Sequence, residues 1–300
     1  MAIWILILCS ALAQDSRDSR DAYLPAARAY IAQGNFGKAA ESLDQLLNGD
    51  PDAGSEPYLM LIDCRLKLNQ KEKALAAAER GIKRYPASGP LLKAAGVMIL
   101  QENSTSERAG ELLERATTAM PQDPGADYAY GLWALMNHHE EIAIAAEKRA
   151  LALSPADDLK VQAQTFIGLG EDALKRPQRA EAAFRAALEV NRKLANPNPG
   201  AELEFAMFLT RQSRPAEAQK LLDEILKFAP GFGPAHLERA KYLSARGDLE
   251  SAVAEAKIAL DQAGLDPKSL RAAHAFLAKT CFALGRMDEA EVHQRWIESH

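Results

Sequence analysis

Histidines beside acidic residues are the side chains of this chain best suited to chemistry. His138 and His139 stand next to Glu140 and Glu141, a combination that can ligate a metal ion. Because two adjacent side chains diverge, we interpret the pair as solvent-exposed residues of a turn. The sequence contains no Gly-rich phosphate loop, no G-x-S-x-G and no H-E-x-x-H motif, and its carboxylates are spread as pairs along helix surfaces. It therefore predicts no catalytic residues, no metal site, no cofactor and no enzyme.

Two further histidines and the cysteines lead to the same conclusion. His274 and His293 fall on two predicted helices of the last segment and can approach each other, but no acidic or cysteine partner stands at a metal-binding spacing. Cys9, Cys64 and Cys281 are too few for a disulfide framework, and they form no C-x-x-C pair. We predict that Cys64 and Cys281 are buried small residues of packed helices.

The charge balance bears on the class of partner. A net charge of −5 over 300 residues argues against a nucleic-acid-binding surface. One stretch is locally basic and would attract an acidic partner, but a charge run on an outer helix is more often a solvated face, and we favour that interpretation. The stretch holds Lys175, Arg176, Arg179, Arg185, Arg192 and Lys193 against Glu181 and Glu189.

A repeated spacing organises the chain around these residues. Pro51, Pro86 and Pro121 are separated by 86 − 51 = 35 and 121 − 86 = 35 residues. An alanine stands twelve residues before each of these prolines, and the series continues to the C-terminus. Such a periodicity is typical of a helical repeat array. The alanines are Ala39, Ala74, Ala109, Ala143, Ala180, Ala218, Ala252 and Ala290.

One unit of the repeat shows its logic. Apolar residues recur at i, i+3, i+4 and i+7 from Tyr23 to Tyr30, which predicts a first helix with one buried stripe. Gly34 supplies a left-handed residue that ends this helix. A second stripe runs from Phe36 to Leu46, and the short turn forces the two helices antiparallel. Ala39 at their crossing lets the backbones approach closely.

This pattern resembles the tetratricopeptide repeat family, which has an aromatic and two small residues, then Tyr, Gly, an aromatic, Ala and Pro in that order. The resemblance covers roughly residues 20–300 and implies an all-α protein, a right-handed α-solenoid of antiparallel helix pairs. We expect an array over 22–300 with repeats near 20–53, 55–88, 90–123, 124–157, 158–195, 199–232, 233–266 and 267–300. In repeat five we expect the second helix to reach Ala195, where the sequence Asn-Pro-Asn-Pro-Gly stops it.

The N-terminus has the form of a targeting segment. Residues 1–13 combine an apolar run with the cleavage pattern Ala11-Leu12-Ala13 of a signal peptide, and residues 14–21 form a polar spacer. The run is too short for a stable membrane span, which takes ~20 apolar residues. No Lys or Arg precedes the apolar run. A translation start upstream of Met1 would explain this. We expect export to a bacterial periplasm, and a cytoplasmic protein if the segment is not a signal.

The resemblance also implies where a partner binds. In this family the first helices line a concave groove, and the corresponding residues here are mostly apolar; repeat eight adds Phe276, Lys279 and Phe282. The basic clamp of the chaperone-docking branch is absent, which favours a helix or an extended apolar segment as ligand. The predicted groove residues are Leu59, Met60, Met98, Tyr128, Leu132, Leu135, Met136, Phe166, Leu169 and Met207. The alternative is that these residues only complete the core.

Three functions follow from these observations. The first is a non-catalytic protein–protein interaction scaffold that binds a peptide or helical segment in the concave groove. The second is a structural subunit or assembly factor of a bacterial envelope or secretion complex, acting through self-association or lateral contacts. Trp296 near the end of the array makes self-association through the C-terminal helix plausible. The third is an accessory domain of an enzyme system whose catalytic part is another polypeptide.

Overall fold

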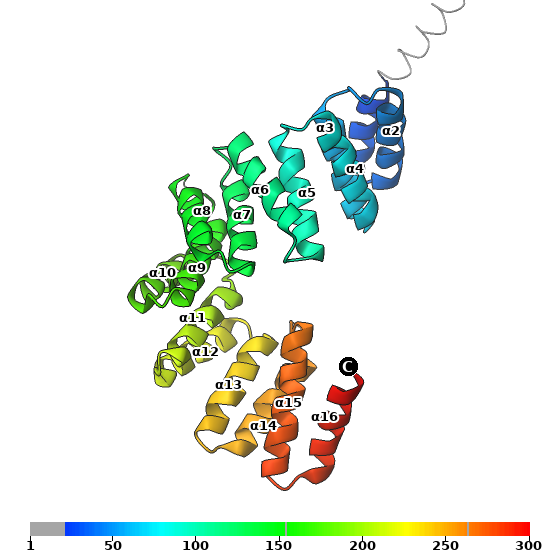
Figure 1. Cartoon of the computed structure of the whole chain (residues 1–300). Coiled ribbons are helices and arrows are strands. Elements are labelled where there is room, and N and C mark those ends of the chain that lie inside the picture. Colours follow the sequence, from blue (N-terminus) through cyan, green and yellow to red (C-terminus); the bar gives the residue numbers. More distant parts are fainter. Residues whose placement is uncertain (1–21, 154, 263) are drawn as a thin grey trace, which may run out of the picture. The chain divides into compact units, whose positions relative to one another are not determined.

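Helices make up all the regular structure of the part of the chain that the structure describes (Figure 1). The structure is a computed structural model, and it describes residues 22–153, 155–262 and 264–300. The predicted signal peptide and spacer, residues 1–21, lie outside the described residues. Within the described ranges no helix combines the length and the hydropathy that a membrane crossing requires. The all-α prediction is confirmed.

The chain divides into two compact units, residues 1–153 and 154–300, which we call unit one and unit two and describe separately. In unit one, residues 22–32 are helical. The helices that follow are α2 (Phe36–Gly49), α3 (Ser55–Lys67), α4 (Lys71–Arg84), α5 (Gly89–Glu102), α6 (Glu107–Ala119), α7 (Pro124–Met136) and α8 (Glu140–Ala152).

Unit two continues the same alternation of first and second helices. It contains α9 (Asp157–Ala173), α10 (Pro177–Asn191), α11 (Pro199–Arg211), α12 (Pro215–Phe228), α13 (Gly233–Ala245), α14 (Leu249–Asp261), α15 (Pro267–Ala283) and α16 (Met287–Ser299). Within each unit every helix packs against the next one along the chain, and first helices also touch the first helix of the following pair. Each pair therefore rests on its immediate neighbours.

The repeat alanines occupy the crossing of the two helices in every pair. Their side chains are between 0% and 8% exposed, and Ala290 in the last pair is the least buried. A methyl group at this point permits close approach of the two backbones, whereas a larger side chain would separate them or strain the packing. The close-packed role predicted for these alanines is confirmed. Cys64 and Cys281 are also buried, as predicted.

A left-handed residue ends the first helix at the same place in successive pairs. It is glycine at Gly34, Gly247 and Gly285, with φ between 71° and 84°. In other pairs the same position, five residues before the repeat alanine, holds a residue with a side chain. These residues are Asn69, His138, Lys175 and Ser213, with φ between 56° and 59°.

Replacing Lys175 with glycine is therefore expected to stabilise unit two. The left-handed conformation costs a residue with a Cβ about 1–2 kcal/mol, while the added flexibility of the unfolded chain offsets roughly 0.4–1 kcal/mol. The net gain in unfolding free energy should be about 0.5–1 kcal/mol, measured by urea denaturation. The matched change Gly247→Ala places a Cβ at φ 84° and should move the midpoint the other way. A destabilising Lys175→Gly would contradict this account of the turn.

A second position decides how the two helices of a pair fill the space between them. Four residues after the repeat alanine, a buried side chain points at the first helix. Leu113 meets Gly96 and Phe184 meets Gly168; a Cβ added to either glycine would lie 2.7 Å or 2.8 Å from the opposing side chain. We call this the facing position. It is occupied by the buried residues Leu43, Ala78, Leu113, Glu147, Phe184, Leu222 and Ala256, whereas Gln294 at the same spacing in the last pair is exposed.

One predicted boundary is wrong. Helix α10 ends at Asn191, not at Ala195, because the buried Asn191 side chain binds the returning chain. Its Nδ2 donates to the Asn198 carbonyl at 3.0 Å and to the Glu202 carboxylate at 3.1 Å. Its Oδ1 accepts from the Asn198 amide at 2.7 Å. These bonds hold Asn198 against the end of α10, so the helix stops short of the Asn-Pro-Asn-Pro-Gly sequence.

Candidate functional site

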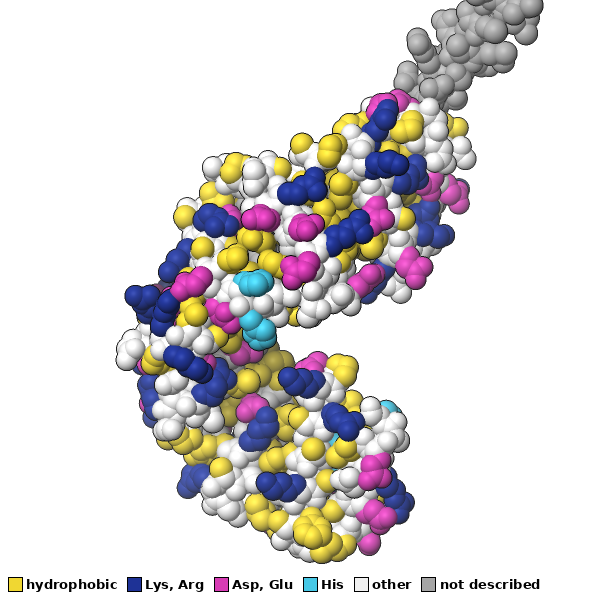
Figure 2. Space-filling view, viewed as in Figure 1, with side chains coloured by type: hydrophobic (Ala, Val, Ile, Leu, Met, Phe, Trp, Pro, Cys, Tyr) yellow, Lys and Arg dark blue, Asp and Glu magenta, His cyan; other side chains and the backbone are white. Residues whose placement is uncertain are grey.

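The first helices of each unit form a continuous surface. In unit one α3 touches α5 and α5 touches α7; in unit two the contacts run from α9 through α11 and α13 to α15. Side chains on the outer side of these helices therefore lie beside one another within a unit. On the face drawn in Figure 2, hydrophobic side chains are interspersed with both signs of charge. Recognition on this face would combine apolar contact with local charge pairing.

A groove at the start of unit one contains two of the predicted residues. Leu59 and Met60, with Ile31, form the apolar part of a hollow of about 470 Å³, which we call the N-terminal groove. Both pack against the core of the unit and remain half-buried. An ion pair between Arg28 and Glu56, with 2.7 Å between Nη2 and Oε1, lies at its edge. The groove thus offers a small apolar floor with charges beside it.

The helix α7 brings together four more predicted residues. Leu132 and Leu135 are half-buried and pack against the core, whereas Met136 is 46% exposed. Tyr128 is half-buried; burial, and secondarily the charge of Glu147, raises its pKa to about 12. We call these four residues the α7 surface. The Tyr128 phenol therefore stays neutral over the physiological pH range.

Met98 does not belong to this surface. Its side chain is only 7% exposed and is part of the core. In its repeat the facing glycine, Gly96, precedes the repeat alanine by 109 − 96 = 13 residues, but Gly131 in the next repeat precedes its alanine by 143 − 131 = 12. One extra residue rotates a helical position by about 100°. The half-buried Val97 takes the outward place that the sequence pattern assigns to Met98.

The remaining predicted residues lie in unit two. Phe166 and Leu169 on α9 are half-buried. Met207 lines a cavity of about 150 Å³, the α11–α13 pocket, together with Leu222 and Tyr242. Sequence reasoning missed Tyr242, because it follows the expected groove pattern less closely than its neighbours. The pocket is large enough for one aliphatic side chain.

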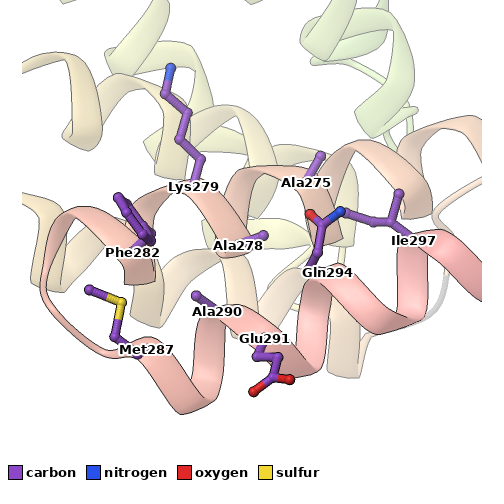
Figure 3. Close-up of a pocket in the computed structure, with 9 residues that line it drawn as sticks. All are labelled: Ala275, Ala278, Lys279, Phe282, Met287, Ala290, Glu291, Gln294 and Ile297. Atoms are coloured by element: carbon purple, nitrogen blue, oxygen red, sulfur yellow. The ribbon is translucent and has the colours of Figure 1, made fainter.

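The last helix pair carries the most exposed apolar side chains near the predicted groove positions. Phe282, assigned to the groove from its place in repeat eight, is 64% exposed. Met287 at the start of α16 is 53% exposed and lies next to it (Figure 3). Sequence reasoning missed Met287, because it is the first residue of the second helix and lies outside the first-helix pattern. The two residues border the same open hollow.

Comparison with known proteins supports the repeat architecture. A tetratricopeptide repeat family model matches residues 24–89. The crystal structure of a tetratricopeptide repeat protein from Parabacteroides merdae ATCC 43184 superposes with a TM-score of 0.69 at 15% identity. That alignment covers 88% of this chain and 99% of the other. The chain therefore has the fold of tetratricopeptide repeat proteins.

Other solved structures resemble this chain over much of its length. Pseudomonas aeruginosa pilF aligns at 19% identity with a TM-score of 0.56, over 68% of this chain and 89% of that one. PilW, described as a widely conserved type IV pilus biogenesis factor, aligns at 15% identity with a TM-score of 0.59, over 72% and 96%. At these identities the likeness is one of fold. The comparison with curated proteins finds no match.

The basic stretch of the chain is largely neutralised by neighbouring carboxylates. Arg185 binds Glu181 at 2.6 Å. Lys193 lies 3.0 Å from Glu189, and Arg192 bonds to the Glu224 carboxylate of the next pair. The predicted solvated face therefore describes this stretch better than a site for an acidic partner.

The predicted histidine pair of the last repeat does come together. The Nδ1 atoms of His274 and His293 are 3.0 Å apart, and the His274 ring stacks on Trp296 with 3.8 Å between centroids. Burial lowers the pKa of both imidazoles, and the charge of His293 acts in the same direction on His274. Among the described residues no group of three metal-ligating side chains is present. The stack holds α16 against α15.

A buried carboxyl in the fourth repeat breaks the apolar pattern of the facing position. The Glu147 side chain is 0% exposed, and no donor from the described residues reaches either of its carboxylate oxygens. It points at Gly131, where an added Cβ would lie 2.3 Å from Oε1. Burial, and secondarily the charge of Asp127, raises the pKa of Glu147 to about 9. Asp127 itself is paired with Arg149 at 2.7 Å. Because its pKa is raised this far, mainly by burial, Glu147 is protonated at neutral pH.

Proposed function

We propose that this chain is a non-catalytic interaction scaffold whose first-helix surfaces bind an apolar peptide or helical segment of a partner protein. Tetratricopeptide repeats are in general protein-interaction scaffolds rather than catalysts, and the matching family model supports that reading here. The observation that carries the proposal is the α7 surface. Leu132 and Leu135 are anchored in the core on one side and open on the other, with the exposed Met136 beside them.

The chemistry of the surface selects the class of ligand. Methionine and leucine side chains adapt to varied apolar groups. An amphipathic helix would present anchors at i, i+3, i+4 and i+7 to such a surface. The N-terminal groove adds the exposed Arg28–Glu56 pair at its edge, which can re-pair with charges of a bound segment. We therefore infer a partner segment with an apolar stripe and mixed charges.

We further propose that the protein acts in a bacterial envelope after export to the periplasm. The fold likeness to PilW, a type IV pilus biogenesis factor by its description, supports this placement. The signal-like residues 1–13 support it independently. The role of a structural subunit that assembles an envelope or secretion complex remains the alternative.

Site-specific photocrosslinking tests the proposal. A photoreactive phenylalanine analogue at Met136 should crosslink a discrete partner in the periplasmic fraction of the native host. The same analogue at Ile142, which is 41% exposed on the second helix of the same repeat, is the matched control and should not. For the crosslinked segment made as a peptide, Met136→Glu should weaken binding at least tenfold, and Ile142→Glu should not. Equal crosslinking at both positions would refute a first-helix binding surface, and adducts confined to the cytoplasm would refute export.

A further inference from the structure

One position on the first helices changes from apolar to acidic in the middle of unit two. Phe166 on α9 and Phe276 on α15 both stand fourteen residues before the repeat alanine of their pair (180 − 166 = 14 and 290 − 276 = 14). The same position holds Glu204 on α11 (218 − 204 = 14) and Glu238 on α13 (252 − 238 = 14). All four side chains are half-buried. Two neighbouring first helices therefore carry carboxylates where the flanking ones carry phenyl rings.

Glu204 has no counter-ion of its own, unlike the charged residues around it. Glu238 accepts a bond from Lys241 at 2.5 Å, and Arg211 on α11 donates to Asp172 on α9 at 3.0 Å. In the part of the chain that the structure describes, no hydrogen bond or ion pair reaches the Glu204 carboxylate. Burial raises the pKa of Glu204; the Arg211 charge opposes this shift and the Glu238 charge adds to it. A half-buried acceptor is thus left without a donor.

The α11–α13 pocket lies beside this carboxylate. Met207 follows Glu204 by three residues, which makes the two neighbours on α11, and Met207 lines the pocket together with Glu238. Gln219 also lines it, and the Gln219 Oε1 atom has no donor among the described residues. The Gln219 amide is oriented by its Nε2, which donates to Asp223 at 2.7 Å. A ligand group with an aliphatic body and N–H donors at its end matches these surroundings.

We propose that the first helices of unit two select a basic side chain, lysine or arginine, of a partner segment. Its aliphatic stem lies over the α11–α13 pocket against Met207, and its cationic head pairs with Glu204. Lysine and arginine suit this place because they bury an apolar stem while the charge stays accessible. An acidic side chain is repelled by Glu204 and Glu238, and an apolar one would desolvate Glu204 without pairing it. This inference rests on the proposed function and adds a charge requirement in unit two.

Selection from a peptide library tests this proposal. The probe is a library of random dodecapeptides displayed on phage and panned on the immobilised full chain, and the enriched peptides should share a lysine or arginine. Once synthesised, they should bind Glu204→Gln about tenfold more weakly than the parent, the loss expected for one hydrogen bond to a charged group. Asp288→Asn is the matched control, because it removes an equal charge from an exposed residue of the second helix α16. It should leave binding unchanged, and neither variant should lower the urea midpoint.

Charge exchange shows whether Glu204 itself makes the contact. A peptide whose basic residue is changed to glutamate should lose binding to the parent and regain it on Glu204→Lys. The proposal is overturned if no peptide is enriched, if the enriched peptides share no basic residue, or if Glu204→Gln binds them as the parent does.

Met136→Glu separates this inference from the proposed function. Peptides that require Met136 but not Glu204 would support the α7 surface and overturn the basic-residue site. Peptides that require Glu204 but not Met136 would support the basic-residue site and count against the α7 surface.

Discussion

Replacing Glu147 with leucine is expected to stabilise unit one by about 1–3 kcal/mol, the cost of burying a polar group that lacks a hydrogen-bond partner. Leucine suits the site because Leu113 occupies the same facing position in the third repeat, where it also opposes a glycine. The variant loses a fully buried carboxyl with no donor in the described residues and keeps most of its volume. Hydrogen exchange of α7 and α8 peptides in the full chain measures the gain.

The same carboxyl makes the stability of unit one depend on pH. Its pKa is raised from 4.5 to about 9 in the folded protein, so between these values the folded state keeps a proton that the unfolded chain releases. Stability should therefore fall as the pH rises through this window, by up to ~1.4 kcal/mol per pH unit. Glu147→Leu should remove this part of the slope.

The control for both effects is Glu147→Gln. Glutamine has a similar shape and no titration, so it should flatten the pH dependence while stabilising less than leucine, because a buried amide remains without a partner. If parent and Glu147→Gln lose stability with pH in parallel, the carboxyl titrates normally and our account of the site is wrong.

Truncating Phe184 to alanine should be among the most destabilising single changes in unit two, costing about 3–5 kcal/mol. The ring is 0% exposed and packs between Phe205 and Phe208, with centroid distances of 5.6 Å and 5.2 Å. Its opposing residue is Gly168, which has no side chain to fill the void. The loss should appear as a lower urea midpoint and as faster exchange in α9 and α10.

Phe184→Leu is the matched comparison, since leucine holds the facing position at Leu113 opposite Gly96. It should cost less than half as much as the alanine variant, because most of the cavity stays filled. Equal losses for the two variants would show that the aromatic ring contacts, and not the volume at the facing position, stabilise this pair.

Much of the fold could be predicted because alanine at a helix crossing is a steric requirement visible in the spacing of one residue type. The left-handed turn was less visible. Gly34 indicates it directly, but at Lys175 and Ser213 nothing in the residue type reveals a positive φ, since the surrounding packing imposes it. The early end of α10 depended on the buried Asn191 side chain and its bonds across the turn, which local propensity does not encode.

The candidate site was predicted less completely, for a geometric reason. Assigning groove residues means counting along a helix, and one extra residue in the third repeat turned Met98 into the core. Glu147 was missed because its neighbours on the chain are charged and its segment resembles a solvated helix. Aligning the facing positions would have singled it out as a carboxyl among Leu43, Ala78 and Leu113.

The way each helix pair rests only on its neighbours has a mechanical consequence. In a molecule with one shared core, tension on the chain ends loads many contacts together, and the structure yields in a single event. Within either unit of this protein, a pull would instead peel pairs away one after another, and those farther along would hold their fold. A stepped force–extension trace would record this sequential unfolding. Each unit would then extend gradually under tension while its remaining pairs stay folded.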